Sequence, residues 1–211
     1  AVYALKVLNK EDLVTTNQVL STKTERRVLE VVNHPFIVRL HYAFETRDKL
    51  CLVMDFVNGG ELFTYISRER GFSEDRTRFY ASEIILALEY LHAMDIIYRD
   101  LKPENILLDR HGHIQLTDFG LSKDAMETQK TYSVVGSPYY MAPEILLNQG
   151  HGKAVDWWSL GVLIFEMLVG LPPFYHDNTR LGYEKLLTGA ALEFPAGASP
   201  AAQGLLAGLV R

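Results

Sequence analysis

Residues 98–105 read Y-R-D-L-K-P-E-N, and thirteen residues after the asparagine comes D-F-G at positions 118–120. The two strings place a proton-accepting carboxylate, a lysine, an amide and a second carboxylate on two neighbouring loops. These are the groups that move a phosphoryl group from a magnesium–nucleotide complex to a hydroxyl. A lone D-F-G recurs by chance, whereas both strings in this order and at short spacing form a specific pattern. Together they predict a phosphoryl-transfer site.

Asp100 is the expected base of this site. A carboxylate within hydrogen-bond reach can orient the attacking hydroxyl and accept its proton. An isolated loop aspartate more often caps a turn, but here Lys102 and Asn105 follow at +2 and +5. Lys102 can neutralise charge on the moving phosphoryl group. Asn105 alone could be a turn residue, but with Asp118 it makes a pair of hard oxygen ligands suited to Mg²⁺.

Lys6 lies in a strand-like alternation at residues 1–8, where an ammonium group needs a partner. Glu25 lies nineteen positions further on, in a predicted helix, and can supply that partner. A lysine held by a glutamate and directed at phosphates acts as an electrostatic clamp. The alternative is a lysine on the solvent face of the strand.

The composition is that of a globular protein. The chain has 211 residues, 48% hydrophobic and 22% charged, with a formal net charge of -5. This charge gives no electrostatic case for nucleic-acid binding and suits basic peptides as partners. No apolar run approaches the roughly 18 residues of a membrane span. The single cysteine, Cys51, excludes an intrachain disulfide and favours a reducing compartment, the cytoplasm or, as a second location, the nucleus.

The order of predicted elements indicates an α+β protein with two lobes. Residues 1–57 are strand-rich, residues 58–211 are helical, and Asn58-Gly59-Gly60 is the clearest break between them. Periodicity and turn residues predict strands at 1–8, 37–44 and 49–56, a polar connection through 15–17, helices at 20–32, 61–68, 73–94, 155–169 and 180–188, and a hairpin of 106–108 with 113–116.

Five motifs in order resemble those of a eukaryotic protein kinase. They are Tyr3-Ala4-Leu5-Lys6, Glu25, Tyr98-Arg99-Asp100, Ala142-Pro143-Glu144 and Asp156-Trp157-Trp158-Ser159. Tyr98 in the first position of its motif, the tryptophan pair and H-P-F-I-V at 34–38 resemble the AGC group, and the chain is similar to protein kinase A and to the N-terminal domains of ribosomal kinases. The resemblance implies a bilobal kinase fold, ATP and Mg²⁺ as cofactors, and serine/threonine specificity, which Lys102 supports.

Carried onto this sequence, the resemblance implies a nucleotide site. Met54 would be the gatekeeper beside the adenine, Asp55 and Val57 would offer backbone groups, and Ala4, Val38 and Leu107 would enclose the base, although apolar strand residues are more often plain core. The full set of implied nucleotide contacts is Ala4, Lys6, Val38, Met54, Asp55, Val57, Glu61, Leu107, Thr117 and Asp118.

Three carboxylates match positions at which basophilic kinases bind arginines before the target residue: Glu61, Glu104 and Glu166. Carboxylates can bind guanidinium groups through two hydrogen bonds, so protein substrates with basic residues before the target Ser or Thr are expected. The alternative for Glu166 is a helix residue with a local partner. Ser137 would keep a hydroxyl contact to the catalytic loop, while Tyr139 replaces a glutamate found in many relatives and puts specificity there in doubt.

The resemblance also implies regulation by phosphorylation. Arg99 and Lys123 would form a basic pocket that a phosphorylated loop residue orders. Ser133, eleven positions before Glu144, stands where that residue lies in the family, and Thr131 and Tyr132 are its neighbours. An upstream activating kinase is therefore an expected partner.

Both ends of the chain depart from the kinase pattern. It opens within a strand-like stretch that lacks the glycine-rich loop expected before Lys6, and it stops at Arg211 in a helix-like stretch. The sequence thus reads as a fragment, which alone could have little activity. Two other functions stay open: a kinase-fold scaffold or pseudokinase, against which the intact catalytic residues argue, and a small-molecule kinase, against which A-P-E at 142–144 and the tryptophan pair argue.

Overall fold

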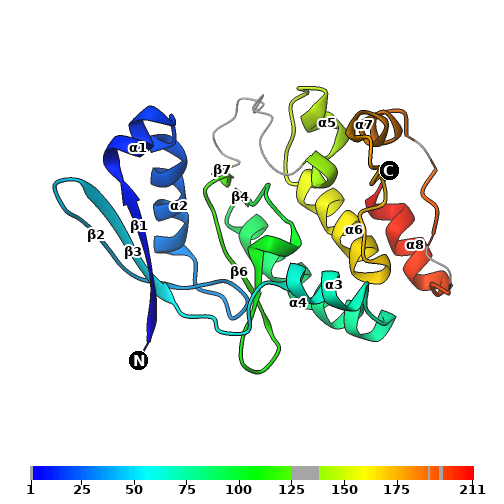
Figure 1. Cartoon of the computed structure of the whole chain (residues 1–211), viewed down its shortest axis with the longest axis horizontal. Coiled ribbons are helices and arrows are strands. Elements are labelled where there is room, and N and C mark those ends of the chain that lie inside the picture. Colours follow the sequence, from blue (N-terminus) through cyan, green and yellow to red (C-terminus); the bar gives the residue numbers. More distant parts are fainter. Residues whose placement is uncertain (1, 125–137, 190, 195–196) are drawn as a thin grey trace.

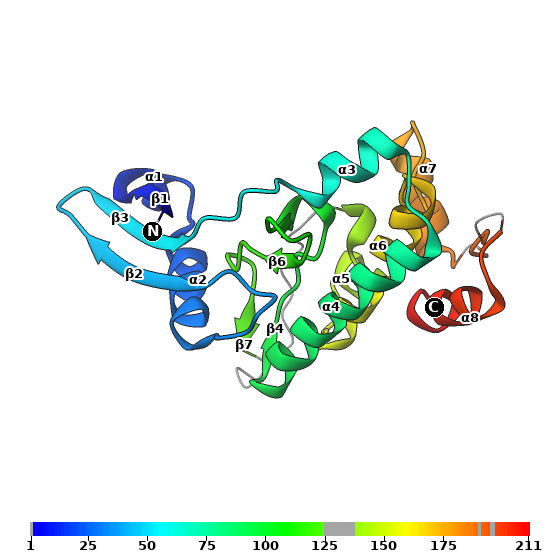
Figure 2. The ribbon, with the colours of Figure 1, turned by 90° about the horizontal axis from the view of Figure 1, so that it is seen from below.

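A computed structural model describes residues 2–124, 138–189, 191–194 and 197–211. A small antiparallel sheet with two helices forms one end of the molecule, and helices form the other (Figure 1). Short strands lie between these ends and carry the loops quoted above (Figure 2). The arrangement confirms the predicted α+β class; the exact boundary between lobes near Asn58 stays a prediction.

The sheet has the strand order β1–β3–β2. Its strands are β1 (Tyr3–Asn9), β2 (Leu40–Glu45) and β3 (Lys49–Asp55), and α1 (Lys10–Thr15) and α2 (Val19–Val31) follow β1. Exposed and partly buried residues alternate along β1, so that Lys6 shares its less exposed face with Ala4 and Leu8. That face lies toward α2, which carries Glu25.

Two expectations for this end were wrong in detail. Helix α1 lies between the strand predicted at 1–8 and the helix predicted at 20–32, where the sequence indicates only a polar connection through 15–17. Leu13 is buried in this helix, but six residues are too few to show helical periodicity. The strand predicted from residue 37 begins only at Leu40. Ile37 instead forms a parallel bridge with Leu116, and Val38 N donates to Leu116 O at 3.0 Å, so this segment ties the sheet to the centre of the molecule.

The helical part starts with α3 (Leu62–Glu69) and the long helix α4 (Glu74–Ala93), whose N-cap Ser73 accepts a hydrogen bond from Arg76 N as expected. The later helices are α5 (Pro143–Leu146), α6 (Ala154–Val169), α7 (Thr179–Leu187) and α8 (Pro200–Leu209). Two strand pairs join this framework: β4 (Ile96–Ile97) with β7 (Lys123–Asp124), and the predicted hairpin β5 (Ile106–Leu108) with β6 (Ile114–Leu116).

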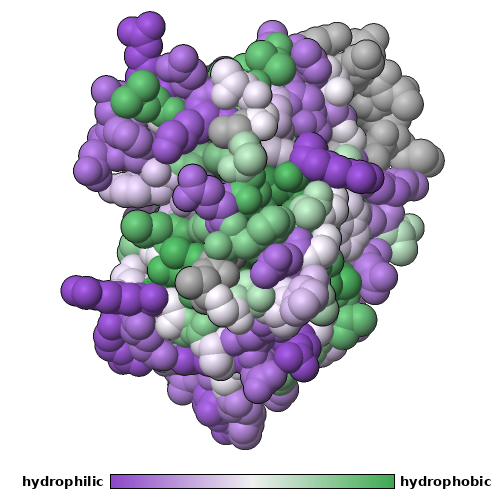
Figure 3. Space-filling view, turned by 90° about the vertical axis from the view of Figure 1, so that its right-hand side faces the viewer, coloured by the Kyte–Doolittle hydropathy of each residue, from purple (hydrophilic) through white to green (hydrophobic). Residues whose placement is uncertain are grey.

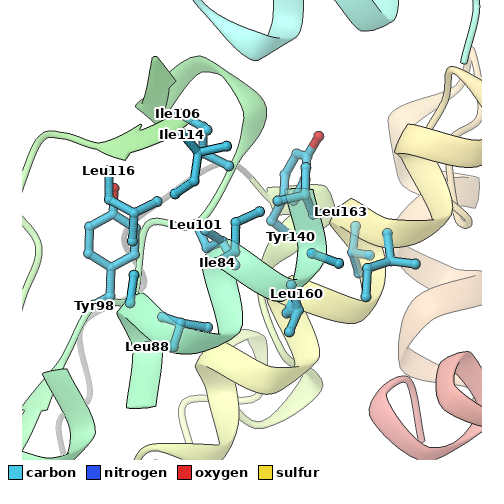
Figure 4. Packing of buried hydrophobic residues seen from close by; sticks show 14 of the residues in the cluster. Ile84, Leu88, Tyr98, Leu101, Ile106, Ile114, Leu116, Tyr140, Leu160 and Leu163 are labelled. Carbon is cyan, nitrogen blue, oxygen red and sulfur yellow. The ribbon is translucent and has the colours of Figure 1, made fainter. Parts of the chain in front are cut away.

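One hydrophobic cluster supports the central loops (Figure 4). Helices α4 and α6 pack against each other, and their side chains meet those of the hairpin and of Leu101. Ile84, Leu88 and Leu101 are almost fully buried. Burying each such side chain contributes about 1.5–3 kcal/mol relative to exposure. The loop at 98–105 therefore rests on a rigid base.

The end of the molecule that carries α7 and α8 shows a hydrophobic strip between hydrophilic regions (Figure 3). Within the described residues, no helix combines the length and apolarity needed to cross a membrane.

Candidate active site

Asp156 in α6 anchors the start of the loop at 98–105 by hydrogen bonds to its backbone. This carboxylate is fully buried; its Oδ2 accepts from Tyr98 N at 2.9 Å, and its Oδ1 accepts from Arg99 N at 2.7 Å. His92 Nε2 lies 2.7 Å from Oδ2. Arg99 has a φ of 65°, in the left-handed region that a side chain disfavours. The two backbone bonds from Asp156 stabilise this turn and so set where the next residue, Asp100, points.

Asp100 lies at the centre of a short polar network. Lys102 Nζ is 3.0 Å from Asp100 Oδ2, and Asn105 Nδ2 donates to the same oxygen at 2.7 Å and to Asp100 O at 2.9 Å. Burial raises the pKa of Asp100 above its usual range, although the bonds from Lys102 and Asn105 act in the opposite direction. The carboxylate is thus held in place and is a better proton acceptor than an exposed aspartate. Its role as the base stays a prediction.

The D-F-G string lies directly beside this network. Thr117 N donates to Asn105 O at 3.0 Å, and the Tyr98 hydroxyl donates to Thr117 O. Phe119 is fully buried with its ring 5.2 Å from that of Tyr98, while the Asp118 side chain is half exposed. The buried Phe119 ring holds residues 118–120 in place, and the Asp118 side chain before it is left partly exposed to solvent.

Lys6 joins the sheet to this loop region. Its Nζ lies 2.6 Å from Glu25 Oε1 and 3.9 Å from Asp118 Oδ1. Burial raises the pKa of Glu25, and the charge and hydrogen bond of Lys6 lower it only in part. The predicted pairing of Lys6 with Glu25 is therefore present, and the ammonium group is directed at the side chain of Asp118.

Some of the side chains described above line one cleft of about 280 Å³, to which β1, α2, the loop at 98–105 and the D-F-G string contribute. Its wall includes Lys6, Glu25, Asp100 and Asp118. No set of three or more His, Cys, Asp or Glu side chains suited to a metal ion occurs in the described part of the chain. Mg²⁺ in nucleotide enzymes needs only one or two protein carboxylates besides phosphate oxygens. Asp118 supplies the one carboxylate, and Asn105, whose Nδ2 is directed to Asp100, has an amide oxygen as a second ligand.

Known proteins are similar to this chain in sequence. The sequence matches the protein kinase domain over residues 1–210. The chain belongs to the protein kinase family. Protein kinase 2 of Dictyostelium discoideum is 56% identical over 209 residues, which are 99% of this chain and 43% of that protein.

Two further relatives are named as serine/threonine kinases. The RAC family serine/threonine-protein kinase homolog of Dictyostelium discoideum is 52% identical over 97% of this chain and 46% of its own length. RAC-beta serine/threonine-protein kinase of Homo sapiens is 50% identical over 99% of this chain and 44% of its own length. They confirm the resemblance to AGC kinases. This kinase domain spans less than half the length of each of the three.

The side chains predicted around the adenine lie apart from that cleft wall. Ala4 pairs with Met54 across the sheet, Val38 is buried against β6, and Leu107 lies in β5. None of the predicted base contacts lines the 280 Å³ cleft. The side chain of Asp55 pairs with His41 Nε2 at 2.7 Å, and Val57 packs against the core. Their roles at the base stay predictions.

Two of the three carboxylates predicted to bind substrate arginines influence each other. Glu166 is buried and accepts a hydrogen bond from the Tyr140 hydroxyl, so the local partner considered above is present. Burial, with the charge of Glu104, nevertheless raises the pKa of Glu166 to about 8. Glu104 Oε2 is buried without a hydrogen-bond partner in the described residues. Glu61 is exposed, at the start of α3, which packs against the turn that carries Glu104.

The regulatory prediction is only partly visible. Ser133 and Ser137 lie outside the described residues, and Lys123 pairs with Ile97 through its backbone in β7. Arg99 Nε donates to Leu121 O at 2.6 Å, and burial lowers the pKa of this guanidinium.

Sequence reasoning missed two residues that place the catalytic loop. Asp156 was noted only as part of a motif, and His92 was not noted at all. Both act across more than fifty positions, through contacts to which the linear pattern gives no direct signal.

Proposed function

We propose that this kinase domain belongs to an enzyme that transfers the γ-phosphoryl group of ATP to Ser or Thr hydroxyls of proteins. The observation that carries the proposal is the convergence of Lys6, Asp100 and Asp118 on one cleft. The three come from a sheet strand and two loops. Lys6 is held by Glu25 and lies 3.9 Å from Asp118, and Asp100 is held by Lys102 and Asn105. Convergence of a base, a metal ligand and a phosphate clamp serves phosphoryl transfer.

Each residue has a role that its contacts support. Asp100 accepts the proton of the attacking hydroxyl, and Lys102 neutralises charge near that carboxylate. The Asn105 amide oxygen and the Asp118 carboxylate would hold the metal, and Lys6 would bind phosphate oxygens while Glu25 fixes its position. Bound Mg-ATP supplies the transferable phosphoryl group and the metal charge that draws electrons toward the leaving oxygens.

The choice of acceptor tests this proposal. With labelled Mg-ATP, peptides that differ only in a single Ser, Thr or Tyr should be labelled on Ser and Thr. Label on Tyr alone would contradict the assignment. A scaffold with no activity, the second candidate, would label none of them, although the intact set of catalytic side chains favours the enzyme.

We also propose that the substrates carry arginine before the target residue. Glu104 and Glu166 place two carboxyl groups close enough to influence each other, and neither pairs with a cation among the described residues. A buried carboxyl group such as Glu166, with the partly buried Glu104 beside it and no cation, is costly to ionise, and a guanidinium group from a substrate would relieve that cost. Glu61, at the start of the neighbouring helix α3, would complete the acidic surface.

The pH dependence of peptide binding follows from Glu166. With a pKa of about 8, this carboxyl group is mostly protonated at pH 7, and a bound guanidinium favours the ionised form. The KM for an arginine peptide should therefore fall by about tenfold between about pH 7 and about pH 9. Steady-state kinetics of wild type and Glu166→Gln measures this. The variant should lose the slope, and an equal slope in both would refute the role of Glu166.

We propose that phosphorylation activates this kinase domain. Arg99 Nη1 is buried without a hydrogen-bond partner in the part of the chain that the structure describes, beside the catalytic base. A phosphorylated residue, for which Ser133 is the candidate, could satisfy it and thereby order the loop. Mass spectrometry of fully active protein should find phosphate on Ser133; its absence there would contradict the proposal.

A further inference from the structure

The hairpin β5–β6 carries both candidate metal ligands. Asn105 directly precedes β5, and Asp118 follows the end of β6 by two residues. Ile106 pairs with Leu116, and the next backbone bond of this ladder joins Thr117 N to Asn105 O. The spacing of the two ligands is thus set by the hairpin register. The placement of Asp118 in the cleft wall and of Asn105 beside Asp100 is set by whatever fixes the hairpin to its neighbours.

Backbone bonds fix the two edges of the hairpin. On the β5 edge, Leu108 N donates to Gly60 O at 2.9 Å, and Gly59 N donates to Leu108 O at 2.8 Å. On the β6 edge, Leu116 exchanges backbone bonds with Phe36 and Val38. The first segment connects β3 to α3, and the second connects α2 to β2. These bonds do not tie the hairpin to α4, the long helix beneath it.

Glu83 of α4 makes that tie. Its Oε2 accepts from Ile114 N at 3.0 Å, and its Oε1 lies 2.6 Å from His113 Nδ1. The Glu83 side chain is buried, and the His113 ring packs between Phe79 at 5.7 Å and Phe36 at 6.2 Å. The hydrogen bond and the charge of Glu83 raise the pKa of His113. Both carboxylate oxygens of Glu83 are thus bonded to residues at the turn end of the hairpin.

We propose that Glu83 is a positioning residue for phosphoryl transfer, which fixes the orientation of Asn105 and Asp118 by clamping the β5–β6 hairpin to α4. The inference rests on the proposed function. Asn105 and Asp118 lie at one end of the two short strands, and the clamp holds the other end. Without the clamp, apolar packing still holds the hairpin against α4 but fixes its tilt less closely than directed hydrogen bonds do. Displacements of about 1 Å at reacting groups are costly.

The same helix offers a matched control. Glu74 also uses both carboxylate oxygens, which accept from Ser199 N at 3.0 Å and from Ser199 Oγ at 2.6 Å. This clasp joins α4 to the start of α8, away from the cleft. Loss of either clasp removes two hydrogen bonds and lowers stability, more so for the buried Glu83 than for the partly buried Glu74. Only loss of the Glu83 clasp is expected to change the metal and nucleotide site.

Fluorescence titration of the purified protein with Mg-ATP, with Mg²⁺ and nucleotide varied separately, tests the inference. Glu83→Ala should weaken the apparent affinity for Mg-ATP about tenfold, while Glu74→Ala leaves it within about twofold of wild type. Glu83→Gln, whose amide can bond both Ile114 N and His113, should restore most of the affinity. The melting temperatures of the variants are recorded alongside.

His113→Ala keeps the test decisive if Glu83→Ala does not fold, because it removes half of the clamp from a half-exposed side chain. It should weaken Mg-ATP affinity several-fold in the same direction. A folded His113→Ala or Glu83→Ala protein with the affinity of Glu74→Ala would overturn the positioning role and leave the proposed function intact. A wild-type protein that does not bind Mg-ATP would overturn both.

Discussion

Replacing Asp100 with Asn should lower kcat for phosphoryl transfer by about 10²–10⁴-fold. The variant keeps an oxygen that can accept hydrogen bonds from Lys102 and Asn105, which now reach Asp100 at 3.0 and 2.7 Å. It loses the group that accepts the proton of the attacking hydroxyl. Mg-nucleotide affinity should change little, because the phosphates are assigned to Lys6 and the metal to Asn105 and Asp118. Steady-state kinetics and nucleotide titration separate the two quantities.

The pH profile gives this prediction a second readout. Asp100 is active as the base only when ionised, and burial raises its pKa. The rate of the wild-type protein should therefore fall on the acid side at a higher pH than an ordinary aspartate would give, and Asp100→Asn should lack that limb. Asp95→Asn, which alters a half-exposed aspartate paired with Lys153 at 2.6 Å, serves as control. Wild-type kcat in Asp100→Asn would refute the role of this residue as base.

Replacing Asp156 with Ala should unfold or strongly destabilise the protein. The change leaves the backbone N–H groups of Tyr98 and Arg99 and the ring of His92 without their acceptor in a fully buried site. Each buried donor left unpaired costs about 1–3 kcal/mol, so with three donors the free energy of unfolding should fall by about 3 kcal/mol or more. The left-handed turn at Arg99 also loses the bond that stabilises it.

Chemical denaturation of the purified variants measures this loss. Asp156→Asn keeps one acceptor oxygen, so its stability should lie between those of wild type and Asp156→Ala. Where Asp156→Asn stays folded, its kcat should still be reduced, because the loop places Asp100. Equal stability of Asp156→Ala and wild type would show that this carboxylate does not hold the loop.

Much of the site was predictable because kinase chemistry is concentrated in short strings. Asp100, Lys102 and Asn105 lie within six residues, and the structure brings them into one network as expected. The pairing of Lys6 with Glu25 could be inferred because an ammonium group on a half-buried strand needs a counter-charge. In these cases the local pattern and the chemical requirement pointed to the same side chains.

Other features depend on contacts between distant positions. Glu83 is one of several polar residues on α4, and only the packed hairpin shows that both of its oxygens are used. The segment around Ile37 has an apolar pattern typical of a strand, but it forms backbone bonds with β6 rather than with the three-stranded sheet. Tertiary packing overrides local propensity in such short stretches. The periodicity of a short apolar segment does not show which of two possible strands it pairs with.

The central claim is that this cleft transfers a phosphoryl group. The most direct test is the initial rate at which the γ-phosphate of Mg-ATP is transferred to a serine peptide, measured for wild type and Asp118→Ala with the same peptide under the same conditions. Asp75→Ala, which alters an exposed aspartate on α4, is the control. The wild-type and control proteins should label the serine at equal rates, while Asp118→Ala should give only background because the cleft has lost its metal-binding carboxylate. Equal rates in Asp118→Ala and wild type would contradict phosphoryl transfer at this cleft.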